Sequence, residues 1–176
     1  HLKAAAELDP RDGQARLALA RSLEAEGEAN EALRHLSRAM ELDPRNEEPV
    51  LDATRLLVGL GRYAEALAVV EAAHGRAPDL GRTAHVLAYL LVASPDPALR
   101  DGERALELAR RVHAAVPSAD HARTLAAALA ELGRCAEASR EVERALAGLG
   151  GGAGAAAARL EADLRRYRSG PPCRLP

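Results

Sequence analysis

The sequence contains no tryptophan, no phenylalanine and only three tyrosines, although 48% of its 176 residues are hydrophobic. Much of that fraction is alanine, which favours helix. A core with so few aromatic rings must pack through leucine, valine and alanine. Long apolar runs are also absent: no stretch approaches the roughly 20 residues that a helix needs to cross a bilayer. Direct membrane insertion is therefore not expected.

An excess of one charge is absent as well. The formal net charge is −2, so the chain as a whole has no attraction to nucleic acid or to anionic lipid, and no nucleic-acid partner is expected. Arginine outnumbers lysine 23 to 1. We attribute this ratio to genomic base composition, because the arginines are scattered over every predicted helix.

Residue patterns that carry chemistry are missing too. The six histidines form no pair at a spacing of four residues with a glutamate, which a helical zinc site would show. No nucleophile-elbow pattern appears. Cys135 and Cys173 have no metal-ligand spacing, and two cysteines make no disulfide framework. We expect Cys135 to be a small buried residue and Cys173 to be exposed in a tail. No catalytic, cofactor or metal site is expected, and the chain is predicted not to be an enzyme.

What the sequence does contain is a proline that returns at a fixed interval. Pro10, Pro44 and Pro78 are 34 residues apart, and Pro117 follows after 39. A period of 34 residues with helical content is typical of helix–turn–helix arrays. Each proline is placed to end a helix, because proline has no amide hydrogen to continue it.

Other positions recur with the prolines. Small and branched apolar residues at three- and four-residue steps predict two amphipathic helices in each repeat. Gly27 and Gly61 fall where the first helix must end, and glycine supplies the left-handed backbone that such an end uses. The third repeat carries five extra residues between its helices.

The C-terminal part of the sequence has a different composition. Residues 148–154 are rich in glycine, and we interpret them as a flexible connector. They do not form a phosphate-binding loop, because no Lys-Ser/Thr pair follows. Leu160, Leu164 and Tyr167 then fall at helical spacing, which predicts a helix that caps the last repeat.

The chain resembles the tetratricopeptide repeat family over roughly residues 1–150. The resemblance lies in the period, the small–large–small spacing, the helix-ending glycine and the terminal proline of each repeat. The large aromatics common in that family's helices are missing. The resemblance implies an all-α fold, a right-handed α-solenoid with a C-terminal capping helix. The expected parts are the end of a truncated repeat (1–10), repeats at 13–46, 47–80, 81–118 with an inserted loop at 94–101, and 119–148, the connector (148–154), the capping helix (155–168) and a tail (169–176).

Two local phrases, residues 94–109 and 164–171, are similar to C-terminal tetratricopeptide regions of bacterial multidomain proteins. That similarity implies a further domain of the same chain before His1. The sequence indicates neither the nature of that domain nor the compartment of the protein.

In this family the first helices of the repeats line a concave groove, so the resemblance implies a protein or peptide partner in that groove. Arg21, Arg55 and Tyr89 occupy equivalent positions in successive repeats and would form a ladder. Because guanidinium offers paired donors to a carboxylate, an acidic peptide is the expected partner. The predicted peptide-binding residues are Gln14, Arg21, Glu48, Arg55, Arg82, His85, Tyr89 and Arg123.

Two alternatives remain open at this point. In the first, Arg21 pairs with Glu24 or Glu48, which leaves a neutral groove. In the second, the array is a structural or oligomerisation appendage at the C-terminus of a larger enzyme, membrane-associated or exported. The clamp with which some family members grip a peptide's terminal carboxylate is not predicted, because Asp52 at a matching place would repel it.

Overall fold

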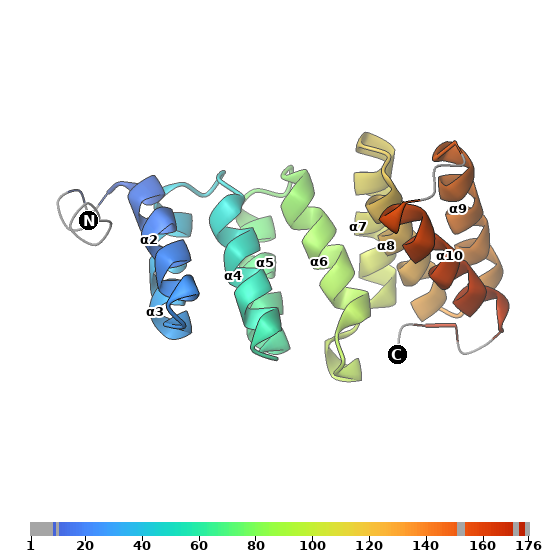
Figure 1. Ribbon diagram of the computed structural model, residues 1–176, viewed down its shortest axis with the longest axis horizontal. Coiled ribbons are helices and arrows are strands. Elements are labelled where there is room, and N and C mark those ends of the chain that lie inside the picture. Colours follow the sequence, from blue (N-terminus) through green and yellow to red (C-terminus); the bar gives the residue numbers. More distant parts are fainter. Residues whose placement is uncertain (1–8, 10, 151–153, 171–172, 175–176) are drawn as a thin grey trace. The chain divides into compact units, whose positions relative to one another are not determined.

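The computed structural model describes residues 9, 11–150, 154–170 and 173–174, so the expected truncated repeat at 1–10 lies almost entirely outside the described residues. Within these ranges the chain forms nine α-helices, one short 3-10 helix and no strand, as Figure 1 shows. The predicted all-α fold is confirmed. The helices are α2 (Gly13–Ala25), α3 (Ala29–Leu42), α4 (Glu48–Gly59), α5 (Tyr63–Arg76), α6 (Gly81–Ala93), α7 (Gly102–Ala115), α8 (Ala119–Glu131), α9 (Cys135–Gly148) and α10 (Ala155–Arg168).

The chain divides into two compact units, residues 1–83 and 84–176, and the boundary falls within α6. In unit 1, α2 packs on α3, α3 on α4, and α4 on α5. In unit 2, α7 packs on α8, α8 on α9, and α10 on both α9 and α8. Each unit is thus built from consecutive helices that pack on their neighbours in sequence, and α10 also packs on the next helix but one.

The turns inside the helix pairs depend on glycine. Gly27, Gly61 and Gly133 follow α2, α4 and α8, and their φ angles are +85°, +72° and +74°. Residues with a Cβ rarely adopt this left-handed conformation. The prediction that Gly27 and Gly61 end their helices in this way is confirmed. Pro44 and Pro78 lie two residues beyond the ends of α3 and α5.

The core of each unit is made of small aliphatic side chains. In unit 1 the fully buried residues include Ala32, Leu36, Ala66 and Val70. In unit 2 alanines play the same part, and five of them have no exposed surface: Ala88, Ala105, Ala126, Ala128 and Ala138. Alanine lets helix backbones approach closely, which is how the chain packs without large rings.

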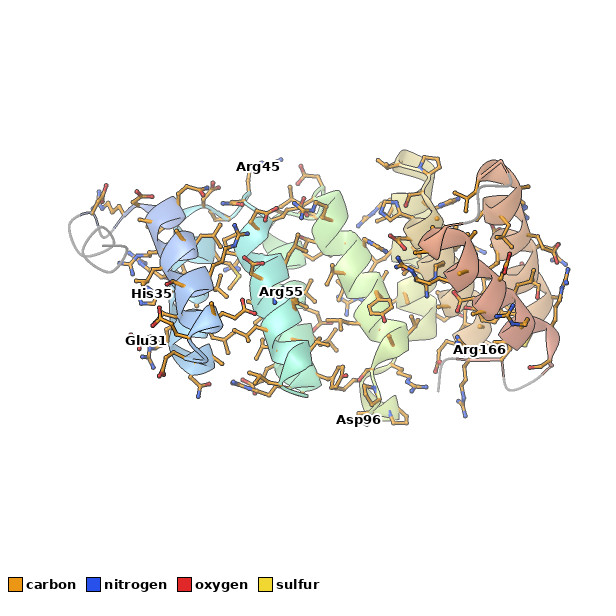
Figure 2. The ribbon with its side chains drawn as sticks, viewed as in Figure 1. Glu31, His35, Arg45, Arg55, Asp96 and Arg166 are labelled. Carbon is orange, nitrogen blue, oxygen red and sulfur yellow. A yellow bond between two sulfur atoms is a disulfide. The ribbon has the colours of Figure 1, made fainter. Side chains whose placement is uncertain are left out.

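The inserted segment of the third repeat is held by polar contacts within unit 2. It contains the 3-10 helix η1 (Pro97–Leu99), and Asp96, labelled in Figure 2, accepts a hydrogen bond from the Ala98 amide. Arg100 Nε donates to the Ser94 carbonyl, and its guanidinium lies 3.6 Å from Glu131 at the end of α8. Both of these charged side chains are largely buried.

The start of α7 makes a close contact with the end of α8. A Cβ atom on Gly102 would lie 2.9 Å from Leu132 Cδ2, which is closer than two carbon atoms can approach. A larger residue here would require the Leu132 side chain to shift, because the backbone of α7 lies directly against it.

The two cysteines form a disulfide, so the expectations for both are wrong: Cys135 is bonded and only partly buried, and Cys173 is buried. Cys135, the first residue of α9, is bonded to Cys173, which is only 1% exposed. Cys173 lies beside the Ala130 carbonyl, with 3.8 Å between Sγ and the oxygen. The sequence failed to indicate the bond because the partners are 38 residues apart and belong to no repeated pattern.

In the described ranges no helix has both the length and the apolar character required to cross a membrane.

Candidate functional site

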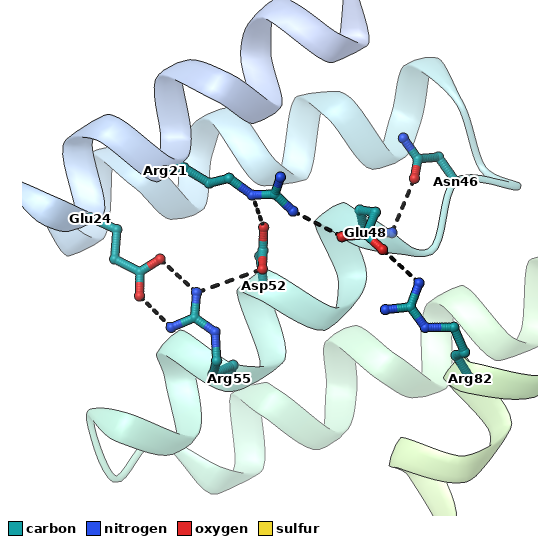
Figure 3. A network of polar contacts seen from close by, with 7 residues as sticks. All are labelled: Arg21, Glu24, Asn46, Glu48, Asp52, Arg55 and Arg82. Carbon is teal, nitrogen blue, oxygen red and sulfur yellow. Dashed lines mark hydrogen bonds and ion pairs between the residues drawn. The ribbon is translucent and has the colours of Figure 1, made fainter.

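The arginines that were predicted to form a ladder in unit 1 are bound to carboxylates of their own chain, as Figure 3 shows. Arg21 on α2 donates to Asp52 and Glu48 on α4, at 2.7 and 2.9 Å. Arg55 on α4, which is labelled in Figure 2, donates from both terminal nitrogens to the two oxygens of Glu24 on α2, at 2.6 and 2.8 Å. Each pair therefore joins the first helix of one repeat to that of the next.

The same network continues to the start of α6. Arg82 is bonded to Glu48, so this carboxylate holds Arg21 on one oxygen and Arg82 on the other. Hydrogen bonding to Asp52 raises the pKa of Arg21, and hydrogen bonding to Arg55 lowers the pKa of Glu24. Both directions follow from the pairing, because each charge stabilises its partner's ionised form.

The first alternative left open by the sequence was that Arg21 pairs with Glu24 or Glu48. Of these two, Arg21 pairs with Glu48, whereas Glu24 pairs with Arg55. The paired donors that would recognise a carboxylate on another molecule already hold carboxylates here. Gln14 is exposed on the same helix as Arg21, and its backbone amide is bonded to the N-cap residue Asp12.

In unit 2 the predicted residues are brought together around a cavity of about 330 Å³. His85 and Tyr89 come from α6 and Arg123 from α8. The remaining lining residues are Asp120, Thr124 and Ala127 of α8 and Arg159, Asp163 and Tyr167 of α10. The capping helix is therefore one wall of the cavity.

A buried ion pair joins α10 to α8 beside this cavity. Arg123 Nε donates to Asp163 at 2.7 Å, and the Asp163 side chain is only 7% exposed. Burial opposes the charge on Arg123, but the hydrogen bond and charge of Asp163 outweigh it and raise the pKa of Arg123. Tyr167, one turn further along α10, is buried as well, and burial raises its pKa.

His85 lines the cavity from α6. Its Nε2 lies 2.9 Å from Thr124 Oγ1, and Thr124 Oγ1 donates to the Asp120 carbonyl at 3.2 Å. The imidazole of His121 lies edge-on to that of His85, with 4.5 Å between the ring centroids. Burial, and then the proximity of His121, lower the pKa of His85, which favours the neutral ring.

The lining charges of this cavity balance. Asp120 and Asp163 are matched by Arg123 and Arg159. The Arg159 side chain is more than half exposed, and its nearest carboxylate, that of Asp120, is 3.9 Å away. Tyr89 is the one large ring in the lining that stands open to solvent, with half its surface exposed. The cavity thus offers an aromatic surface, a loosely paired cation and neutral polar groups.

The contribution of α10 was missed by the sequence analysis, which treated that helix only as a cap. The sequence did contain one indication of this role. Asp163 lies between Leu160 and Tyr167 on the apolar face of the predicted helix, and burying a carboxylate there is costly unless it has a partner. The sequence could not identify Arg123 as that partner, because the two residues are 40 positions apart.

These features define a class, the α-solenoids built from helix–turn–helix repeats. The tetratricopeptide repeat family model matches residues 23–90, which confirms the predicted resemblance to that family over this segment. No curated protein matches the sequence.

Several solved structures share the fold. The chain is similar to YrrB, described as a tetratricopeptide repeat protein with an unusual peptide-binding site, at 20% identity and a TM-score of 0.65, covering 94% of this chain and 77% of YrrB. It is similar to a MamA protein at 16% identity and a TM-score of 0.63, covering 82% of this chain and 77% of the MamA chain. It is also similar to a thermophilic tetratricopeptide repeat protein of Thermus thermophilus at 22% identity and a TM-score of 0.61, covering 96% and 86%.

Proposed function

We propose that this chain is a protein–protein interaction module and that the cavity between α6, α8 and α10 receives part of a partner segment. The observation that carries the proposal is the convergence of His85, Tyr89 and Arg123 on one open cavity in unit 2. The family supports the general role, and the peptide-binding site named for YrrB supports a peptide as the ligand.

The chemistry of the cavity suggests what the partner carries. An exposed tyrosine ring favours an apolar or aromatic side chain, because such rings bury much area at little entropic cost. An acidic residue of the partner would find Arg159, whose own ion pair is long. Arg21 and Arg55 support an acidic partner less well, since a ligand would have to displace Glu24, Glu48 and Asp52.

The oligomerisation alternative depended on the face of Leu160, Leu164 and Tyr167. Leu160 and Tyr167 are buried within unit 2, so this face is already used inside the unit. We therefore give priority to the binding module.

A peptide selection tests the proposal. Random peptides displayed on phage are selected on the wild-type chain, and the affinity of the best peptide is measured by calorimetry. Replacement of a central aromatic contact removes about 2 kcal/mol or more of binding energy, so Tyr89→Ala should weaken binding at least tenfold. The matched control is Leu60→Ala, because Leu60 is a similarly exposed apolar residue in unit 1, at 46% against 50% for Tyr89.

Two results would contradict the proposal. One is a peptide that binds Tyr89→Ala as tightly as the wild type but is lost in Arg55→Ala, which would return the site to the arginine ladder. The other is a selection that yields no peptide above background.

A further inference from the structure

The cavity in unit 2 is complete only while α10 lies against α8. Arg159, Asp163 and Tyr167 form one wall, and all three belong to α10. Without that helix, the remaining lining of α6 and α8 would be an open surface. The attachment of α10 therefore decides whether the site exists.

Without the disulfide, α10 is held by its packing on α9 and α8. Leu160 and Tyr167 are fully buried, Asp163 pairs with Arg123 of α8, and Arg168 pairs with Glu143 of α9 at 2.8 Å. The helix has 14 residues, a length at which an isolated helix is marginal in water.

The covalent attachment lies at the C-terminal end of α10. Cys173 follows the helix and is bonded to Cys135 at the start of α9. The bond closes a segment that contains α9, the glycine-rich connector and α10. Because Cys173 is buried against the α8–α9 turn, the bond fixes the end of α10 to the helices on which α10 packs.

We infer that the Cys135–Cys173 disulfide is a redox latch that keeps α10 in place and thereby keeps the binding cavity assembled. A dithiol reductant opens it by thiol–disulfide exchange: the S–S bond breaks, both cysteines become thiols, and the dithiol gives up two electrons and two protons to become a disulfide. Cys135 is only partly buried, so its sulfur is the accessible point of attack, whereas Cys173 is 1% exposed.

The consequence for binding rests on the proposed function, because the latch regulates that same cavity. In the oxidised chain the wall is in place and a partner is bound. In the reduced chain α10 separates from α8 for a larger fraction of the time, and the apparent affinity falls by the fraction of chains that keep the wall. The partner is then one that meets this protein in an oxidising compartment.

Hydrogen exchange measured by mass spectrometry tests the latch without any partner. The 176-residue chain is compared oxidised, in dithiothreitol, and after re-oxidation. We expect amide exchange in residues 155–168 to accelerate at least tenfold on reduction and to recover on re-oxidation, while α4 in unit 1 is unchanged. Equal exchange of α10 in both states would overturn the inference. So would equal acceleration of α4, since that would show loss of the whole fold.

A second readout uses the three tyrosines. In a Cys135→Ser, Cys173→Ser double variant, tetranitromethane meets no thiol and nitrates tyrosines according to exposure. Tyr167 is 2% exposed in the oxidised chain and Tyr89 is 50% exposed, so Tyr89 is an internal reference. We expect Tyr167 to gain at least tenfold in nitration relative to Tyr89. A Tyr167 that stays unreactive would overturn the latch.

These readouts separate the two proposals. If α10 opens on reduction but Tyr89→Ala binds peptide normally, the latch is supported and the proposed site is contradicted. If Tyr89→Ala weakens binding but α10 does not open on reduction, the proposed site is supported and the latch is contradicted.

Discussion

The two units of this chain use their charged residues in different ways. In unit 1 the guanidinium groups of Arg21, Arg55 and Arg82 lie on the surface and bind carboxylates of neighbouring repeats. In unit 2 the principal pair joins the partly buried Arg123 to the buried Asp163 and lies beside a cavity. The same residue type thus serves as a surface link in one unit and as part of a cavity wall in the other.

This difference shows why equivalent positions in a repeat protein need not have equivalent roles. A guanidinium that faces the next repeat finds a carboxylate on that repeat, as Arg21 finds Asp52 and Glu48. In unit 2 the position equivalent to Arg21 and Arg55 is occupied by Tyr89. The arginine on α8, Arg123, contacts the capping helix α10 instead. The neighbour therefore determines the role of the residue more than its place in the repeat does.

The largest expected effect is that of the disulfide, which only unit 2 has. Closing a loop of 38 residues stabilises a fold by about 4 kcal/mol in the chain-entropy account. The Cys135→Ser, Cys173→Ser variant should lower the free energy of unfolding of unit 2 by about that amount, with helix content retained at low urea. Urea denaturation with peptide-resolved exchange measures both units. A loss shared equally by unit 1 would contradict the comparison.

The second effect concerns the buried pair. Asp163→Ala leaves the Arg123 guanidinium partly buried without its carboxylate, and we expect unit 2 to lose about 2 kcal/mol, less than for a fully buried pair because Arg123 is 30% exposed. The matched control is Glu161→Ala, an exposed carboxylate two residues earlier on α10. Thermal unfolding followed by circular dichroism measures both variants. If they unfold at the same temperature, the pair does not anchor α10.

The third effect is a pH dependence confined to unit 2. The pKa of His85 is lowered in the folded chain, so the unfolded chain binds more protons. Stability from this residue is complete above the unfolded pKa of about 6.5 and is lost as pH falls through the folded value. We expect this decline in the wild type and not in His85→Gln. His121, Asp120 and Arg123 also face this region. A decline that persists in His85→Gln would assign it to one of them.

The smallest effect is expected in unit 1. Arg21→Ala or Arg55→Ala should each lower stability by about 0.5 kcal/mol or less, because exposed ion pairs contribute little. The loss should shrink further in about 1 M salt, where exposed charges are screened. Urea denaturation at two salt concentrations measures it. A loss above about 2 kcal/mol would mean that the network in Figure 3 stabilises unit 1 as strongly as the buried pair stabilises unit 2.

The helical architecture could be predicted because its signals are local. Gly27 and Gly61 occupy the left-handed helix ends that their spacing predicted, and the alanine and leucine stripes are the buried faces. These features depend on residues within a few positions of one another, so a single sequence is enough to identify them.

The cavity and the disulfide could not be predicted because their partners lie far apart in the sequence. Asp163 is buried by contact with Arg123, 40 residues earlier, and Cys173 by a bond to a residue 38 positions earlier. The repeat period gives no guidance to either distance, since α10 and the tail follow the last repeat. The expectation of an exposed Cys173 failed for that reason, whereas the places of His85, Tyr89 and Arg123 on the first helices follow the repeat, and their role in binding stays a prediction.

The contact between Gly102 and Leu132 has a consequence for the evolution of this chain. An alanine at position 102 would place its methyl group against the Leu132 side chain, so that side chain would have to shift or become smaller. Changes at 102 are therefore expected together with changes at 132 more often than alone. Such joint changes would record the approach of α7 to α8 in an alignment of relatives.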